Sequence, residues 1–426
     1  MDFANNSRKA ISLFSSAGIG ELGLRSNGIE VVLSNEIDAR RQRLYQQNFP
    51  QAKCVLGDIR LKKNEILGYL RDRFPSEDWF LVYATPPCQG MSTNGAGKLL
   101  NGVRSGERSP IDERNRLIIP AMDLIAEIRP RWVLFENVPG MRNTTISDEH
   151  GRDVNILKYV ERRLGPEYVG GGEVISCQDY GVPQLRRRLL AIYTRDSGGV
   201  RHFNQSGFTF FPDSEKKPRV TLRDAIGRLP PLEAVEGRHS RKEFHALHYV
   251  PVMKAEKFWW MSHTPEGDTA FNNQCVNPAC GFRGNARHAD IREDGVWRSS
   301  GATPINCANC GALLPRPSLL DKTSGKRRLL RGFHSAYRRM KWDEPAPALT
   351  QNFLYEASDN KVHPTQTRVL SIYEALIVQT IADYGYDFQL DGNYIPSTLF
   401  ADVIGESVPP KLIDMICRMM MRVSSP

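Results

Sequence analysis

WFLVYATPPCQ, residues 79–89, is the stretch that decides the fold of this chain. Its first six residues are apolar, which predicts a parallel strand that is buried on both faces. Two prolines then restrict the backbone, so the side chain of Cys88 follows the strand in a well-defined direction. Ligands of open α/β sheets bind at the carboxyl ends of the strands, where Cys88 is expected. A buried, inert thiol is the alternative interpretation of this cysteine taken alone.

Strand-like and helix-like segments alternate on both sides of this stretch. We expect strands at 9–14, 29–34, 54–56, 79–84 and 131–135, and helices at 18–26, 39–49, 64–74 and 112–128. This alternation predicts an α/β fold with a doubly wound, mostly parallel Rossmann-like sheet. The glycine-containing stretch 91–109 is expected to be a long loop, either a lid over a substrate or a disordered segment.

Reactive side chains occur next to two further predicted strands. Glu136 follows the strand at 131–135, and Arg186 and Arg188 precede a strand-like run at 189–193. Alternate residues of a strand share one face, so the two guanidinium groups can act together. With Cys88, these residues supply a nucleophile, an acid and hydrogen-bond donors. A solvated basic turn is the competing interpretation of the arginines.

Composition narrows the class of protein without deciding it. The 426 residues carry 57 Lys and Arg against 48 Asp and Glu, a formal charge of +9 that favours a polyanionic partner. We find no segment long and apolar enough to span a membrane and no signal peptide, so a cytoplasmic location is expected. Eight cysteines in a chain of this length are better interpreted as thiols or metal ligands than as disulfides.

Several short motifs occur in the order seen in cytosine-5 DNA methyltransferases. They are ISLFSSAG at 11–18, SNE at 34–36, GDI at 57–59, PPCQ at 86–89, ENV at 136–138, Q-x-R-x-R at 184–188, PALT at 347–350 and VIGESVPP at 403–410. The chain therefore resembles the bacterial modification methylases of that family over nearly its whole length, the middle excepted. The resemblance implies S-adenosylmethionine as cofactor and methylation of a cytosine that is flipped out of duplex DNA.

The resemblance also implies a cofactor site. Its expected residues are Phe14, Ala17, Gly18, Glu36, Ile37, Asp58, Ile59, Pro86 and Ser407. The carboxylate of Glu36 suits the two ribose hydroxyls, and that of Asp58 would accept a hydrogen bond from the adenine amino group. Glu406 stands where the family usually has asparagine, so contacts near the cofactor are expected to differ there.

The expected catalytic residues are Cys88, Glu136, Arg186 and Arg188. The Cys88 thiolate would add to carbon 6 of cytosine, and a protonated Glu136 would stabilise charge at ring nitrogen 3. The two arginines would hold the ring carbonyl oxygen and a nearby phosphate. Contacts to DNA are expected from Gln89, Ser92, Gln184, Arg327, Arg328 and Arg331, and phosphate contacts also from the basic cluster 338–341.

Two cysteine pairs, each followed by glycine, lie in the middle of the chain. Cys275 and Cys280 form the first pair, and Cys307 and Cys310 the second. This spacing predicts a zinc ribbon over 275–310, whose metal is structural because four thiolates fill its coordination shell. Unligated cysteines are the alternative, and His288 is a less favoured ligand.

We expect three regions: an S-adenosylmethionine-binding catalytic domain at 1–195, a smaller irregular target-recognition domain at 196–342, and a segment at 343–426 that returns to complete the first. The predicted partner is double-stranded DNA, with a restriction endonuclease acting on the same site as a possible second partner and the chain itself a monomer. Two alternatives stay open. One is a transfer-RNA methyltransferase of the same fold, and the other is a catalytically silent nucleic-acid-binding module.

Overall fold

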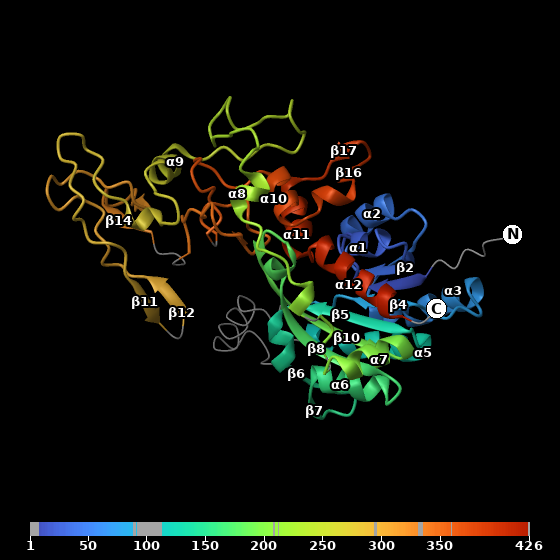
Figure 1. The fold of residues 1–426 in the computed structure, drawn as a ribbon. Helices are drawn as coiled ribbons and strands as arrows, with labels where there is room; N and C mark the ends of the chain where they lie inside the picture. The colour runs from blue at the N-terminus through green and yellow to red at the C-terminus, as the bar shows by residue number, and fades with distance from the viewer. Residues whose placement is uncertain are drawn as a thin grey trace.

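The computed structural model describes residues 8–87, 91, 113–207, 209–211, 213–293, 296–330, 335–358 and 360–424. Four predicted site residues, Cys88, Gln89, Ser92 and Arg331, lie outside these ranges, as does all of the expected loop 91–109 except Met91. The described residues form a larger lobe around a sheet and a smaller lobe beside it (Figure 1). None of their helices is long and apolar enough to cross a membrane.

A seven-stranded sheet with the order β3-β2-β1-β4-β5-β10-β8 forms the centre of the larger lobe (Figure 1). Its strands are β1 Lys9–Leu13, β2 Glu30–Glu36, β3 Lys53–Leu56, β4 Leu81–Ala84, β5 Trp132–Asn137, β8 Val169–Ser176 and β10 Arg187–Thr194. The first five are parallel, and β10 is antiparallel to both β5 and β8. The predicted α/β fold with a mostly parallel sheet is thus confirmed.

Helices cover both faces of the sheet because successive side chains of each buried strand point to opposite sides. One face packs against α3 Ile59–Arg73, α5 Ile118–Ile128 and α6 Ile156–Leu164. The other packs against α1 Glu21–Arg25, α7 Ser197–Gln205 and α12 Pro410–Val423. Helix α3 begins at Ile59 rather than at residue 64, because the Asp58 side chain accepts a hydrogen bond from the amide of Arg60 and caps the helix.

The end of the chain returns to the larger lobe. Helix α12 packs on α1, where Gly23 permits the contact: an added Cβ would lie 2.4 Å from the amide nitrogen of Asp414. Helices α10 Ile372–Val378 and α11 Ser397–Glu406 share a second core with α2 Ala39–Asn48 and α8 Leu222–Ile226. The core on the α12 face also includes Phe203, Phe210 and Phe211, which follow the expected domain boundary at 195.

Short strand pairs connect these parts or lie at their edges. They are β6 Thr145–Ser147 with β7 Asp153–Asn155, β9 Gln184–Leu185 with β15 Ala346–Pro347, and β16 Gln389–Leu390 with β17 Asn393–Tyr394. The parallel pair β9–β15 joins the segment just before β10 to the returning part of the chain.

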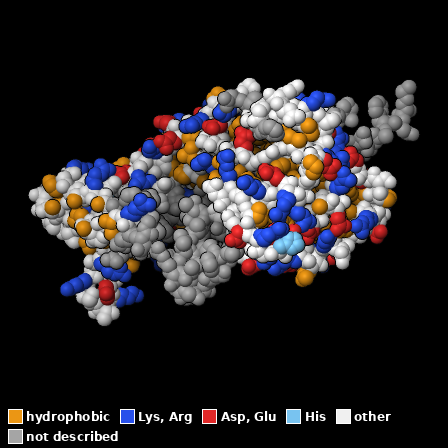
Figure 2. Space-filling view, turned by 90° about the horizontal axis from the view of Figure 1, so that it is seen from below, with side chains coloured by type: hydrophobic (Ala, Val, Ile, Leu, Met, Phe, Trp, Pro, Cys, Tyr) orange, Lys and Arg blue, Asp and Glu red, His pale blue; other side chains and the backbone are white. Residues whose placement is uncertain are grey.

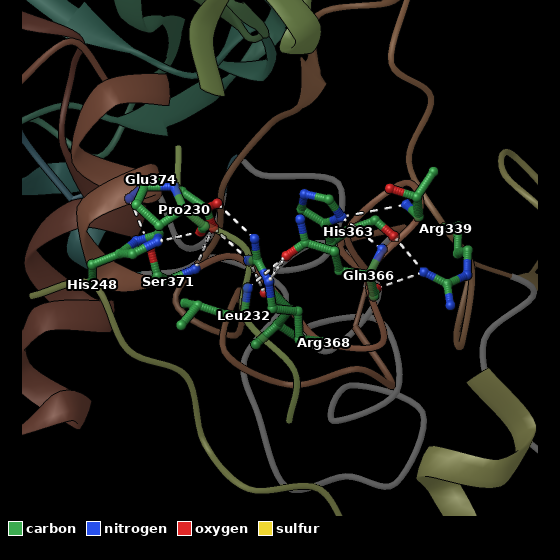
Figure 3. A network of polar contacts seen from close by, with 11 residues as sticks. Pro230, Leu232, His248, Arg339, His363, Gln366, Arg368, Ser371 and Glu374 are labelled. Atoms are coloured by element: carbon green, nitrogen blue, oxygen red, sulfur yellow. Dashed lines mark hydrogen bonds and ion pairs between the residues drawn. The ribbon is translucent and has the colours of Figure 1, made fainter. Parts of the chain in front are cut away.

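The smaller lobe contains α9 Ala255–Ser262 and the hairpins β11 Asp290–Glu293 with β12 Val296–Ser299 and β13 Ser318–Leu320 with β14 Arg327–Leu329. Its core includes Trp260 and Phe271, together with Val362 from the returning segment. A buried polar network lies at the junction of the lobes (Figure 3). Within it, Arg368 pairs with Glu374 at 2.6 Å, and Arg339 donates to the carbonyl of His363 at 2.8 Å.

Candidate active site

Side-chain hydrogen bonds connect the carboxyl ends of neighbouring strands. Asn35, at the end of β2, donates to the carbonyl of Gly57 at 3.0 Å. Thr85 Oγ1, after β4, donates to the carbonyl of Phe14 at 2.7 Å. Asn137 Nδ2, at the end of β5, donates to the carbonyl of Pro86 at 2.9 Å. These bonds hold the loops after β1, β3 and β4 in fixed positions at one edge of the sheet.

Asn137 has a role that the sequence argument did not assign. By holding the carbonyl of Pro86, it restrains the segment that leads into Cys88, which itself lies outside the described residues. Its side-chain oxygen also accepts from the amide of Val138 at 2.8 Å. One indication of this role was present in the sequence: Asn137 is a polar residue at the end of a strand that is otherwise mostly apolar and is fully buried.

Glu136 and Arg188 form an ion pair in the same region. In the β5–β10 register Glu136 faces Leu190, so Arg188 is its diagonal neighbour on the same face. The Nε of Arg188 lies 2.7 Å from Oε1 of Glu136, which is only 6% exposed. Burial raises the pKa of Glu136, and the charges of Arg188 and Arg186 offset this only in part. Glu136 can therefore hold a proton more readily than an exposed carboxyl group.

Arg186 lies in a different environment from Arg188. Its buried guanidinium group donates to the carbonyls of Leu349 at 2.8 Å, Gly405 at 3.0 Å and Ser407 at 2.7 Å. These bonds connect the segment before β10 to the returning part of the chain. The expected catalytic role of Arg186 is therefore replaced by a positioning role, because its donors are directed at backbone carbonyls.

Gln184 is also turned into the protein. It is fully buried, its Nε2 donates to Oε1 of Gln379 at 2.6 Å, and its Oε1 accepts from the amide of Leu349 at 2.9 Å. The expected contact of Gln184 with DNA is wrong in this structure, because the side chain is buried and bonded to Gln379 and Leu349.

The loop after β1 contains several residues with left-handed backbone. Phe14, Ser16 and Gly18 have φ values of 58°, 48° and 81°. Gly18 has no room for a side chain, since an added Cβ would lie 2.7 Å from the ring of Phe49. The carbonyl of Ala17 accepts a hydrogen bond from the Tyr386 hydroxyl at 2.5 Å. The predicted residues Phe14, Ala17 and Gly18 thus belong to one tightly held loop.

Glu36 organises the next part of this edge. Its Oε2 accepts from the amide of Ser16, and its Oε1 accepts from the amides of Ile37 and Asp38, each at 2.8 Å. Three of about four lone-pair positions are used, which leaves acceptor capacity for a hydroxyl group. Ile37 is 68% exposed beside it and presents an apolar surface for a flat ring. These features fit a nucleoside.

The other predicted cofactor residues vary in accessibility. Asp58 pairs with Arg60 at 2.5 Å, and the hydrogen bond from Arg60 lowers the pKa of Asp58. The side chains of Ile59 and Pro86 are buried. Ser407 donates its hydroxyl to the carbonyl of Ile404 at 3.0 Å. Of these four residues, Asp58 and Ser407 are the ones that are partly exposed.

Four cysteine sulfurs converge in the smaller lobe. The Sγ atoms of Cys275, Cys280, Cys307 and Cys310 all lie within 4.8 Å of one another. The Cys275–Cys310 and Cys280–Cys307 distances are 3.7 and 3.9 Å. Four sulfurs placed tetrahedrally at 2.3 Å from a zinc ion lie about 3.8 Å apart, so this arrangement is compatible with zinc.

The predicted DNA-binding arginines have different surroundings. Arg328 is exposed on β14, whereas Arg327 pairs with Glu256. Lys and Arg side chains are visible on both lobes in Figure 2. Arg339 is only 3% exposed and donates to the carbonyls of Thr264 and His363, so its expected phosphate contact is wrong (Figure 3).

The sheet, with an acid and a basic partner at the carboxyl edge, defines an α/β enzyme of the methyltransferase fold. A crystal structure of a prophage-encoded DNA modification methyltransferase (E. coli) has this fold, with a TM-score of 0.53, 21% identity and coverage of 98% of this chain and 99% of that chain. The model of the C-5 cytosine-specific DNA methylases matches residues 8–422. The chain belongs to this family.

Two curated relatives cover nearly the whole chain. The Type II methyltransferase M1.HgaI of Avibacterium volantium is 30% identical over 419 residues, covering 96% of each chain. The Type II methyltransferase M.AgeI of Thalassovita gelatinovora is 27% identical over 453 residues, covering 95% of this chain and 97% of the relative. The predicted enzyme class, a DNA cytosine-5 methyltransferase that uses S-adenosylmethionine, is confirmed at the level of the family.

Proposed function

We propose that this chain methylates carbon 5 of a cytosine in a specific duplex DNA sequence through a covalent adduct of Cys88. The observation that carries the proposal is the buried Glu136–Arg188 pair beside the loop that leads to Cys88. Bound S-adenosylmethionine supplies the methyl group. A silent binding module would have no use for a buried acid and a nucleophile at one edge of the sheet.

The chemistry divides among three side chains. The Cys88 thiolate adds to carbon 6 and makes carbon 5 nucleophilic. Protonated Glu136 donates to ring nitrogen 3, where negative charge develops, and its raised pKa favours this form. Arg188 fixes the orientation of the Glu136 carboxyl group and can donate from its other nitrogens to the ring carbonyl oxygen. After carbon 5 has been methylated, a water molecule accepts the carbon 5 proton and Cys88 leaves as a thiolate, which restores the aromatic ring.

The cofactor site is proposed at the loop after β1 and the ends of β2 and β3. Phe14, Ala17 and Gly18 would surround the methionine half, and Glu36 would accept from the ribose. The remaining residues proposed here are Ile37, Asp58, Ile59, Pro86 and Ser407, with Ile59 and Pro86 acting through their backbone. We propose the same three regions with the second boundary near 342, but with the first region extended beyond 195 to include Phe203, Phe210 and Phe211.

We further propose that the four cysteines bind one structural zinc ion. The sulfur–sulfur distances support tetrahedral coordination, and Gly281 and Gly311, with φ values of 57° and 72°, allow a tight turn after each pair. Four thiolates leave no position for an activated water, so the ion would stabilise the target-recognition domain.

Arg328 on β14 is the best placed of the described predicted residues to meet DNA phosphates. The Type II names of the relatives support a restriction endonuclease acting on the same site, and a DNA substrate supports a cytoplasmic location. A monomeric state is also part of the proposal.

The decisive experiment supplies labelled S-adenosylmethionine with plasmid DNA or with transfer RNA. We expect label on carbon 5 of cytosine in DNA and none on RNA. Cys88→Ser should abolish transfer while retaining DNA binding, and duplexes with 5-fluorocytosine should trap the unaltered chain covalently. Methylation by Cys88→Ser at a comparable rate would refute the mechanism.

A further inference from the structure

Arg41 forms an ion pair with the residue that departs from the family pattern. Its Nη1 lies 2.6 Å from Oε2 of Glu406, whose other oxygen accepts a hydrogen bond from Gln351. Arg41 lies in the first turn of α2, shortly after Glu36, while Glu406 ends α11 directly before Ser407. The pair therefore bridges the two sides of the proposed cofactor site.

The guanidinium group of Arg41 still has donor capacity on its buried side. Its side chain is 18% exposed, and its Nε is buried without a hydrogen-bond partner among the described residues. Burial opposes its charge, but the carboxylates of Glu406, Glu36 and Asp38 more than offset this and raise the pKa of Arg41. It therefore stays charged, and an unpaired buried donor favours any ligand that brings an acceptor.

We propose that Arg41, oriented by Glu406, binds the carboxylate of the methionine half of S-adenosylmethionine. This inference rests on the proposed function, which places the ribose on Glu36. The methionine half ends in an ammonium and a carboxylate, and a guanidinium group matches the carboxylate in charge and planar geometry. Glu36, Asp38 and Glu406 can orient Arg41 but cannot themselves attract an anionic group.

The test compares two ligands that differ only in this carboxylate. Calorimetry on the full chain would measure Kd for S-adenosylhomocysteine and for its decarboxylated analogue, S-adenosyl-3-thiopropylamine. We expect the unaltered chain to prefer the first by on the order of ten- to hundredfold. Arg41→Gln should remove most of this preference by weakening S-adenosylhomocysteine alone. The matched control Arg43→Gln should keep it, because Arg43 on the same helix is 59% exposed and pairs with Asp391.

Each other outcome has a definite meaning. Equal weakening of both ligands by Arg41→Gln would show a purely structural role and overturn the inference, as would equal affinity of the unaltered chain for the two ligands. If Arg41→Gln does not fold, Arg41→Met removes the charge and every donor while keeping the apolar stem, and an unchanged preference in that variant would also overturn it. Failure of the unaltered chain to bind either ligand would instead refute the proposed function.

Discussion

Replacing Arg186 by Met should destabilise the protein, whereas the same change at Arg187 should not. Arg186 donates to the carbonyls of Leu349, Gly405 and Ser407. Ser407 keeps a second donor, Gln379 Nε2 at 2.7 Å. The buried carbonyls of Leu349 and Gly405 lose the hydrogen bond from Arg186, and the carbonyl of Glu406 loses a longer and less buried one of 3.3 Å, so the main cost comes from two buried acceptors. At about 1–3 kcal/mol for each buried acceptor, the free energy of unfolding should fall by about 2–6 kcal/mol. We expect a loss near the lower end of this range, because Met also removes the cost of burying the charge of Arg186.

Denaturant unfolding followed by tryptophan fluorescence measures this difference. Arg187 is exposed, so Arg187→Met should change the free energy of unfolding by less than about 0.5 kcal/mol. Arg186→Lys, which keeps the charge but has fewer directed donors, should lie between the two. The interpretation would be refuted if Arg186→Met were as stable as Arg187→Met but had lost methyl transfer, because Arg186 would then act in the chemistry.

Three further perturbations test the site, the core and the smaller lobe. Glu136→Gln removes the proton donor to ring nitrogen 3, so the methylation rate should fall on the order of a hundred- to thousandfold. The affinity for S-adenosylhomocysteine should stay unchanged. A loss of that affinity at an unchanged methylation rate would show that Glu136 belongs to the cofactor site instead. Glu21 is buried with Ser12 as a hydrogen-bond donor, and burial raises the pKa of Glu21 to about 7. Folding therefore favours its protonated form, and about 3 kcal/mol of stability should be lost as pH rises from about 4.5 to about 7, a loss that Glu21→Gln should abolish in pH-dependent unfolding. Metal analysis should find about one zinc ion per chain. Cys307→Ser should lower both the zinc content and the affinity for specific DNA, while cofactor binding persists. A metal-free protein that keeps its full DNA specificity would contradict this prediction.

Six of the seven strands of the sheet could be predicted from the sequence because they are short and apolar. Strand β8 was missed, because its sequence VGGGEVIS contains three glycines and no apolar run. Errors occurred at element ends, where local hydrogen bonds decide: Asp58 starts α3 early. The smaller lobe gave no periodic pattern, because its core joins distant residues such as Trp260 and Val362. Only the resemblance to a family indicated that the C-terminal segment returns to the sheet.

The site could be predicted where a side chain follows a buried strand, as Glu136 does. The sequence could not distinguish Arg186 from Arg188, since both are arginines that come shortly before the strand predicted at 189–193. The returning segment separates them by presenting carbonyls to Arg186, while Arg188 stays beside Glu136. Asn137 was missed because its partner is a backbone carbonyl, which no side-chain pattern reveals.

The same returning segment supports the cofactor loop, so cofactor binding and docking of this segment should be thermodynamically linked. Helix α1, Glu21–Arg25, is too short to be stable alone, and the left-handed conformations of Phe14 and Ser16 persist only if their surroundings hold them. Tyr386 supplies part of that support through its bond to the carbonyl of Ala17. A ligand that binds only the docked form at 100 times its Kd stabilises that form by about 2.7 kcal/mol. S-adenosylhomocysteine should therefore protect the amides of α11 and α12 from hydrogen exchange as well as those of the loop it contacts, and protection confined to the loop would show that the two are independent.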